Sequence, residues 1–173
     1  MQYNSIHRLT INDIIIKFQL APHPEGGWYK ENYRAAGTIP HNVLPNIFTG
    51  DRSFSTAIYF LLEQGNFSAF HRIQSDECWH FYAGGPLVIY VINDDGSLEK
   101  ITLGSNILQG ETFQYVVPTG CWFASAPAEG TDYSFVGCTV APGFDFEDFE
   151  LAERDALIEQ YPQHADVITI LTR

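Results

Sequence analysis

A long series of short apolar segments separated by turn signals is the feature that most constrains the fold of this chain. The breaks between the segments contain Gly, Pro, Asn and Asp, and residues 93–96 (NDDG) are a strong hairpin signal. Many short strands at such spacing are typical of a β-sandwich or a β-barrel. The expected strands cover residues 28–34, 53–62, 67–73, 77–83, 87–92, 99–103, 113–117, 121–126 and 133–140.

Helical patterns flank this β-rich region. Thr10 and Asp13 form a capping signal, and the apolar residues after it predict a short helix. Residues 22–27 (PHPEGG) combine stiff prolines with permissive glycines, so we expect no regular structure there. At the other end, residues 149–161 carry apolar side chains at helical spacing and predict a helix that Pro162 stops.

The composition indicates a globular protein and argues against several partner classes. With 173 residues, of which 45% are hydrophobic, the chain is long enough to bury the core of one domain. Its 9 basic and 21 acidic residues give a net charge of −12, which argues against nucleic acids and anionic membranes as partners. Part of the acidity is expected to form a solvated face containing Asp145, Glu147, Asp148, Glu150, Glu153 and Asp155.

Cysteine usage and the N-terminal sequence predict a cytoplasmic protein. Cys78, Cys121 and Cys138 are far apart in apolar surroundings and form no CxxC pair, so we interpret them as buried reduced thiols. The N-terminus lacks the pattern of a signal peptide. No run approaches the roughly 20 apolar residues that a membrane-spanning helix needs.

Four blocks of sequence resemble the cupin-5 family, also known as DUF985, of the cupin superfamily. They are residues 20–29 (LAPHPEGGWY), 75–82 (SDECWHFY), 117–120 (VPTG) and 136–146 (VGCTVAPGFDF). The resemblance implies a mainly β fold, the cupin double-stranded β-helix or jelly roll, and usually a homodimer. It also implies structural likeness to deoxysugar-nucleotide epimerases, seed storage proteins and auxin-binding protein, without an established activity.

The expected organisation is therefore a single cupin domain over residues 1–173. Its barrel core would cover about residues 28–142, and the short N-terminal and C-terminal helices would pack outside the barrel.

The resemblance also bears on metal binding. Metal cupins take two His and one Glu from a first motif and one His from a second. The first motif aligns on residues 65–84 and retains His71 and Glu77, but Ile73 stands where the second His belongs. The second motif has Phe123 in place of its His. Because a transition metal normally has three or four protein ligands, we expect no metal and no cofactor, with a metal-dependent cupin enzyme as an alternative.

His71 and Glu77 are the candidate catalytic residues. An imidazole titrates near neutral pH and can act as a general base. Glu77 can orient the imidazole, or act as an acid when it is desolvated. Such a pair can epimerise a carbon next to a carbonyl, whereas the simpler alternative is that the pair only fills a polar cavity. His80 lies on the opposite strand face from Glu77 and is interpreted as structural.

Ligand binding is expected inside the barrel and at the loop of residues 22–27. Glycines let the backbone approach a ligand, and prolines keep the loop preorganised. An Arg could meet an anionic ligand group, and Arg34, Arg52 and Arg72 are the candidates considered, although strand alternation places Arg72 on the outer face. The expected ligand-binding residues are His23, Glu25, Gly26, Gly27, Tyr29, Tyr59, Trp79, Phe81, Tyr115 and Phe123.

These observations predict a small-molecule-binding cupin that acts as a metal-free isomerase or epimerase on a sugar- or nucleotide-like polar ligand. A tyrosine is the candidate donor of the second proton, with Tyr29, Tyr59 and Tyr115 as the alternatives. The alternative from another class is a non-catalytic ligand-binding or storage-like homodimer.

Overall fold

The computed structural model describes residues 9–173, so residues 1–8 of the expected domain lie outside the described part of the chain. Its helices are α1 (Ile11–Phe18), α2 (Arg154–Gln160) and α3 (Ala165–Ile170). Its strands are β1 (Ala21–Pro22), β2 (Trp28–Arg34), β3 (Thr38–Ile39), β4 (Arg52–Ser53), β5 (Thr56–Glu63), β6 (Ser68–Arg72), β7 (Asp76–Gly84), β8 (Leu87–Ile92), β9 (Leu98–Leu103), β10 (Gln114–Val117), β11 (Trp122–Pro127), β12 (Tyr133–Ala141) and β13 (Glu150–Leu151).

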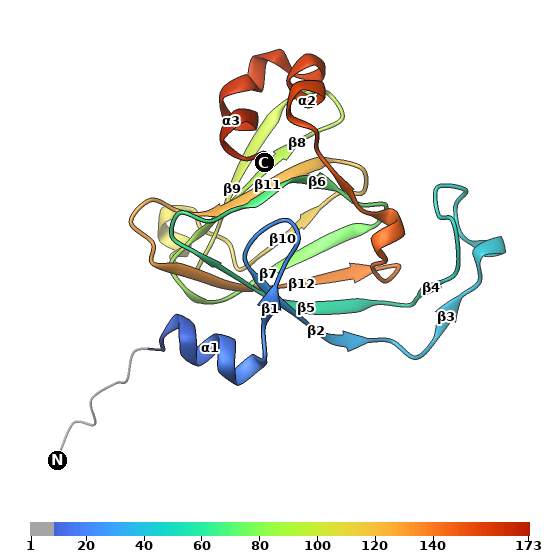
Figure 1. Cartoon of the computed structure of the whole chain (residues 1–173), viewed down its shortest axis with the longest axis horizontal. Helices are drawn as coiled ribbons and strands as arrows, with labels where there is room; N and C mark the ends of the chain where they lie inside the picture. Colours follow the sequence, from blue (N-terminus) through green and yellow to red (C-terminus); the bar gives the residue numbers. More distant parts are fainter. Residues whose placement is uncertain (1–8) are drawn as a thin grey trace.

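Two antiparallel sheets face each other and form the body of the molecule (Figure 1). One sheet has the order β1-β2-β5-β12-β7-β10 and the other has the order β13-β6-β11-β8-β9. Strands distant in sequence are therefore neighbours, since β12 lies between β5 and β7 and β11 lies between β6 and β8. The expected mainly β architecture is confirmed, and the NDDG turn joins β8 and β9 in the hairpin that the sequence indicates.

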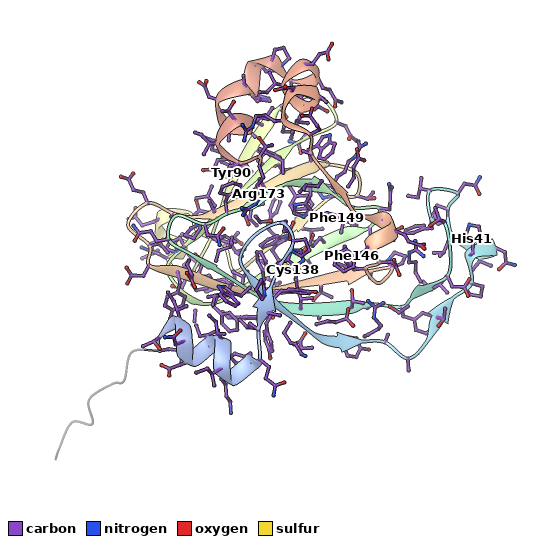
Figure 2. All side chains as sticks on the ribbon, in the orientation of Figure 1. His41, Tyr90, Cys138, Phe146, Phe149 and Arg173 are labelled. Carbon is purple, nitrogen blue, oxygen red and sulfur yellow. The ribbon has the colours of Figure 1, made fainter. Side chains whose placement is uncertain are left out.

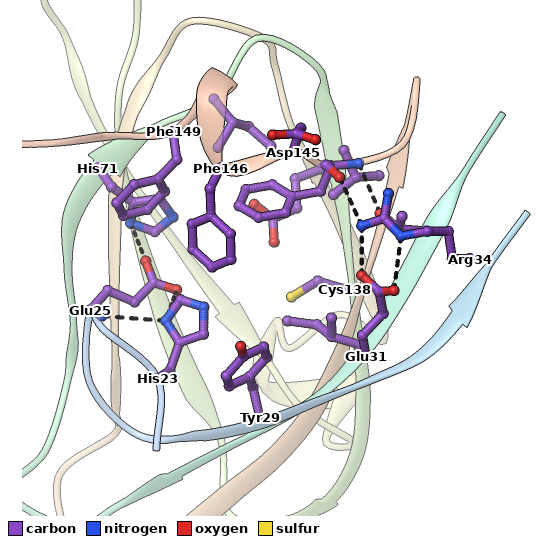
Figure 3. A pocket seen from close by; sticks show the side chains of 16 residues that line it. His23, Glu25, Tyr29, Glu31, Arg34, His71, Cys138, Asp145, Phe146 and Phe149 are labelled. Carbon is purple, nitrogen blue, oxygen red and sulfur yellow. Dashed lines mark hydrogen bonds and ion pairs between the residues drawn. The ribbon is translucent and has the colours of Figure 1, made fainter. Parts of the chain in front are cut away.

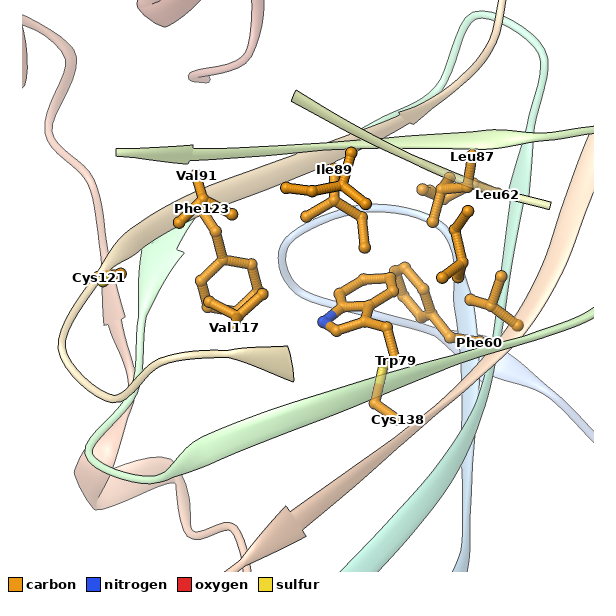
Figure 4. Close-up of a cluster of buried hydrophobic side chains, with 13 residues drawn as sticks. Phe60, Leu62, Trp79, Leu87, Ile89, Val91, Val117, Cys121, Phe123 and Cys138 are labelled. Atoms are coloured by element: carbon orange, nitrogen blue, oxygen red, sulfur yellow. The ribbon is translucent and has the colours of Figure 1, made fainter. Parts of the chain in front are cut away.

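Apolar side chains from both sheets pack in the space between them (Figure 4). Trp79 lies at the centre, with its ring edge-to-face against Phe60 and Phe123 at centroid distances of 5.9 and 6.3 Å. Burial of a large apolar side chain contributes about 1.5–3 kcal/mol, so this cluster is a main source of stability. The fully or nearly fully buried members include Leu62, Leu87, Ile89, Val91, Leu103, Val117 and Val136.

The helices pack on parts of the outer faces of the two sheets (Figure 1). α1 packs on the six-stranded sheet through Ile14, and its start has the capping box that the sequence predicts between Thr10 and Asp13. α2 and α3 pack on the five-stranded sheet through Leu157 and Ile168. None of the helices within residues 9–173 has both the length and the apolar character needed to cross a membrane.

The C-terminal region differs from the helix expected over residues 149–161. Residues 150–151 instead form β13, which pairs with β6, and the backbone N–H of Ala152 donates to the carbonyl oxygen of Phe70 at 2.8 Å. Residues 150–151 therefore pair with the open edge of β6, although the apolar spacing around them also suits a helix. The expected helix forms over the rest of this range as α2, which ends at Gln160 just before Pro162, and Pro162 begins a 3-10 turn that leads into α3.

The expectation that the acidic residues between 145 and 155 form one solvated face is also wrong for Asp148 and Asp145. Asp148 is buried, and its carboxylate receives two hydrogen bonds of 2.6 Å from the guanidinium of Arg52, which is also buried. This ion pair joins β4 to the segment that follows β12. Asp145 also departs from the expectation, because it lines a cavity.

Candidate functional site

A cavity of about 190 Å³ lies beside the apolar core, between the two sheets (Figure 3). Strands β2, β5 and β12, the loop after β1 and the segment after β12 contribute most of its lining. β6 and β7 add His71 and Glu77. The apolar lining residues are Ile58, Ile73, Val140, Phe144, Phe146 and Phe149, and the polar ones include His23, Glu25, Tyr29, Glu31, Arg34, Thr56, His71, Glu77, Cys138 and Asp145.

The loop after β1 folds Glu25 into the cavity. His23 and Gly27 close a tight turn, because the N–H of His23 donates to the carbonyl oxygen of Gly27 at 3.0 Å. Gly26 and Gly27 have φ angles of 117° and 75°, which a residue with a Cβ rarely adopts. The carbonyl oxygen of Glu25 accepts from the N–H of Ala69 at 3.1 Å and fixes the loop to β6. The glycines of this loop therefore shape the turn, while its charged side chains reach the cavity.

His71 and Glu25 form a buried ion pair that sequence reasoning did not predict. The Nδ1 atom of His71 lies 2.7 Å from Glu25 Oε2 and 2.7 Å from the carbonyl oxygen of Ala69. Burial lowers the pKa of His71, but the charge and hydrogen bond of Glu25, together with Glu77 and the carbonyl group of Ala69, outweigh burial and the net pKa is raised. Burial raises the pKa of Glu25, but the charge and hydrogen bond of His71, together with His23 and Ser68, give a net lowering. Each partner therefore favours the charged form of the other, the imidazolium of His71 and the carboxylate of Glu25.

His23 is a neutral companion of this pair. Burial lowers its pKa, which outweighs the attraction of Glu25. Its Nδ1 atom accepts a hydrogen bond from the backbone N–H of Glu25 at 3.3 Å. The same Nδ1 atom also lies 3.2 Å from Glu25 Oε1. The ring packs edge-to-face on Tyr29, with the two centroids 4.4 Å apart.

Glu77 is a buried carboxyl group of the cavity that titrates near neutral pH. It is 7% exposed, and burial among apolar side chains raises its pKa to about 7, while the charge of His71 opposes the rise. Its side chain hydrogen-bonds with Cys138, whose thiol has a pKa raised well above its ordinary value by burial. Near neutral pH, Glu77 therefore exchanges a proton while Cys138 stays a thiol.

The raised pKa of Glu77 predicts how stability depends on pH. Between the ordinary value of 4.5 and about 7, the folded chain binds more protons at Glu77 than the unfolded chain does. The free energy of unfolding should therefore fall as the pH rises through this window, by up to about 3 kcal/mol at about 1.4 kcal/mol per pKa unit. Urea unfolding at several pH values should show that Glu77→Gln flattens this decline. Parallel curves for the wild type and the variant would contradict the shift.

The donor set does not fit the metal site of a four-ligand cupin. Ile73 lines the cavity at the position of the second His, and Phe123 packs its ring on the imidazole of His71, with centroids 4.1 Å apart. The Nδ1 atom of His71 is already engaged by Glu25 and Ala69. Within residues 9–173, no group of three or more His, Cys, Asp or Glu side chains is arranged to hold a metal ion.

Several expected ligand-binding residues lie away from the cavity lining. Trp79 and Phe123 are each 1% exposed in the apolar core, with Phe81 and Tyr115 packed against them. The hydroxyl of Tyr115 donates to Glu99 at 3.0 Å. Tyr59 faces the opposite side of the sheet and packs on Phe18 of α1. Gly26 and Gly27 line a separate shallow depression beside Arg173.

His80 and Arg72 lie outside the cavity, as strand alternation predicts. His80 is half-buried on the outer face of its sheet, where its ring nitrogens contact Thr139 and Gln114. Arg72 pairs with Glu150 at 2.7 Å.

Sequence reasoning missed part of the cavity wall. Cys138 and Val140 alternate with outward residues on β12, so strand periodicity could have placed them inside. Phe144, Phe146 and Phe149 follow β12 in a segment with only a three-residue 3-10 turn, Phe146–Asp148, which is too short for a periodic pattern to indicate direction. Figure 2 shows Phe146 and Phe149 among all the side chains of the molecule, near Cys138. Of the three arginines considered for a ligand, Arg34 lines the cavity.

The two facing antiparallel sheets and the cavity between them define a protein of the cupin fold. The sequence matches the family model described as "Cupin superfamily (DUF985)" over residues 12–152, and the chain belongs to this family. A curated relative, the uncharacterized protein YML079W of Saccharomyces cerevisiae, is 32% identical over 148 residues, which are 80% of this chain and 73% of the relative.

Solved structures agree with this assignment. Protein SO0799 from Shewanella oneidensis has 41% identity and a TM-score of 0.84, over 96% of this chain and 99% of that one. A hypothetical protein from Leishmania major has 37% identity and a TM-score of 0.85, over 95% and 99%. Oxalate decarboxylase from Bacillus subtilis shares the fold at 12% identity and a TM-score of 0.53, over 87% of this chain and 36% of that one. The expected cupin jelly roll is confirmed.

Proposed function

We propose that this protein is a metal-free isomerase or epimerase that binds a small, sugar-like polar molecule in the cavity. The observation that carries the proposal is Glu77, a buried carboxyl group that lines the cavity and has a pKa of about 7. A general acid–base group is most effective when its pKa is near the working pH. This assignment exchanges the roles expected from the sequence, because Glu25 holds His71 in its charged form.

In the proposed reaction, the Glu77 carboxylate removes a proton from the carbon next to a carbonyl group of the ligand. The electron pair of the broken C–H bond moves to the carbonyl oxygen and gives an enolate. The imidazolium of His71 stabilises this oxyanion by its charge, and Glu25 keeps the imidazole protonated. For isomerisation, the hydroxyl group on the deprotonated carbon passes its proton to the enolate oxygen and becomes the new carbonyl group, while Glu77 returns its proton to the former carbonyl carbon. For epimerisation, the Tyr29 hydroxyl delivers a proton to the opposite face of the deprotonated carbon. Glu77 then releases its proton to solvent, and the tyrosine takes one up from solvent.

Solvent exchange tests this function without knowledge of the natural substrate. The purified protein is incubated in D₂O with glucose, fructose and glucosamine, and NMR follows the loss of the signals from C–H groups next to the carbonyl. We expect at least one sugar to exchange faster than in buffer alone. If the sugars bind but none exchanges, the non-catalytic ligand-binding function replaces the enzyme.

We also propose that two copies of the chain associate through the outer face of the six-stranded sheet. Tyr82 on β7 and Val116 on β10 are 49% and 48% exposed on this face, beside Cys78 and Thr139. These side chains carry no charge at neutral pH, although the chain has a net charge of −12. An uncharged face is where two strongly acidic chains repel each other least.

Sedimentation velocity tests the dimer. The wild type should sediment with twice the chain mass of 19.5 kDa, and the double variant Tyr82→Asp/Val116→Asp should sediment as a monomer. Ile107→Asp is the matched control and should stay dimeric, because Ile107 is 61% exposed and lies in the turn of residues 107–109, not on β7 or β10. A monomeric wild type, or a dimeric double variant, would rule out this interface.

A further inference from the structure

The cavity has more carboxyl groups than basic groups. Four carboxyl groups line it, those of Glu25, Glu31, Glu77 and Asp145. The basic side chains in the lining are His23, Arg34 and His71, and burial keeps His23 uncharged. Two cations therefore face four carboxyl groups, and the balance is negative even when Glu77 is protonated.

Both cations are already paired with carboxylates of the protein. Arg34 donates to Glu31 through Nε at 2.9 Å and through Nη2 at 2.8 Å, and Nη2 also donates to the carbonyl oxygen of Phe144 at 3.1 Å. His71 lies 2.7 Å from Glu25. An anionic ligand would have to break one of these pairs while it faced Glu77 and Asp145, which is electrostatically costly.

The outer part of the cavity is built from aromatic rings. Phe144, Phe146 and Phe149 pack edge-to-face in every combination, with centroid distances of 5.1, 6.2 and 6.4 Å and interplanar angles of 70–78°. Figure 3 shows Phe146 and Phe149 on one side of the cavity and Tyr29 on the other. Phe146 is 52% exposed, which is unusual for a Phe in a well-packed segment. Ring faces beside a carboxylate are the chemistry by which proteins recognise ammonium groups.

Hydrogen bonds of the backbone hold these rings in place. The N–H of Phe144 donates to Thr56 Oγ1 at 2.9 Å, and the N–H of Gly143 donates to the carbonyl oxygen of Ser53 at 2.8 Å. Asp145 Oδ1 accepts from the N–H of Glu147 at 3.0 Å. The rings and the carboxylate are therefore preorganised, which lowers the cost of binding.

We propose that the cavity selects a small organic cation, an amine or a quaternary ammonium compound, with its positive charge held by Phe144, Phe146 and Asp145. This inference narrows the class of ligand in the proposed function. It rests on the proposed function for the placement of the ligand's reactive carbon at Glu77. A cavity of about 190 Å³ holds the volume of about six water molecules, so the enclosed part of the ligand is no larger than a monosaccharide. An amino sugar meets both requirements, whereas a nucleotide brings phosphate charge that the cavity repels.

The test compares ligands of the same shape and different charge. NMR titrations of the full chain use glucosamine, glucose and glucuronate, with tetramethylammonium as a probe of the cation site alone. We expect tetramethylammonium to shift the resonances of residues 144–149 saturably, and glucosamine to bind at least about ten-fold more tightly than glucuronate. Tighter binding of glucuronate, or no saturable shift with tetramethylammonium, would overturn the proposal.

Two variants test which side chains bind the cation. Phe146→Ala should weaken tetramethylammonium binding about five-fold, as expected for the loss of one cation–π contact. Asp145→Asn should weaken it about three-fold, while the amide can still cap the turn at Glu147. Phe113→Ala, at a 53% exposed site outside the cavity lining, is the matched control and should change nothing. Equal weakening by Phe113→Ala, or none by Phe146→Ala, would place the cation elsewhere.

The outcomes separate this inference from the proposed function. Selective binding of cations without solvent exchange supports the cation site and contradicts the enzyme. Exchange of an anionic sugar that Glu77→Gln abolishes supports the enzyme and contradicts the cation site.

Discussion

Glu77→Gln should slow solvent exchange by at least about 100-fold, because the amide cannot accept the proton that the carboxylate removes. The side chains have the same shape, and Glu77 is close to half-protonated at pH 7 in the wild type. Loss of the charge therefore changes the fold little. The variant should keep its affinity for a bound sugar, so that the defect lies in the exchange rate and not in binding.

The same assay provides the controls. Glu99→Gln removes an exposed carboxylate that contacts Tyr115 outside the cavity lining, and it should exchange at the wild-type rate. The wild-type rate should rise with pH through about 7, as Glu77 loses its proton. A Glu77→Gln protein that exchanges at the wild-type rate would exclude Glu77 as the base.

Asp148→Asn should lower the free energy of unfolding by about 3 kcal/mol, which is the largest stability effect that we expect from a single isosteric change. Asp148 and Arg52 have side chains that are 4% and 2% exposed, and two hydrogen bonds of 2.6 Å join them. Removing one charge leaves the guanidinium of Arg52 buried, with Glu147 at 3.6 Å, the more distant charge of Asp145 and the carbonyl oxygen of Asp51 at 2.9 Å as its remaining partners. Breaking a buried ion pair from one side costs about 3–5 kcal/mol.

Glu150→Gln is the matched control, because it removes one carboxylate from an exposed ion pair two residues away. Arg72 and Glu150 have side chains that are 38% and 52% exposed, and such pairs contribute about 0–1 kcal/mol. Urea unfolding of the two variants should therefore give clearly separated midpoints. Equal midpoints would show that solvent or Glu147 compensates for the buried Arg52.

The strands could be predicted because their signals are local. β2 and β8 match the expected ranges residue for residue, since glycine-containing turns come directly before each of these strands. The capping box of α1 lies within four residues and could be predicted for the same reason. The helix expected over residues 149–161 begins only at Arg154, because the free edge of β6, about 80 residues earlier, pairs with residues 150–151.

The candidate site was predicted in part. Alternation along β6 and β7 points His71 and Glu77 inward, and both line the cavity with His23, Glu25 and Tyr29. The aromatic residues Trp79 and Phe123 also point inward, but they fill the core. Strand periodicity predicts which face of the sheet a side chain lies on. It does not predict whether an inward side chain fills the core or lines the cavity.

The sequence by itself determined which elements form, which faces of the strands turn inward, and that the metal-ligand set of the cupin motif is incomplete. Only the tertiary structure decided the chemistry of the cavity, because it places Glu25 against His71, which is 46 residues later, and leaves Glu77 desolvated beside Cys138. The charge of a buried group depends on every neighbour within a few ångströms. Those neighbours come from loops and strands that no local pattern brings together.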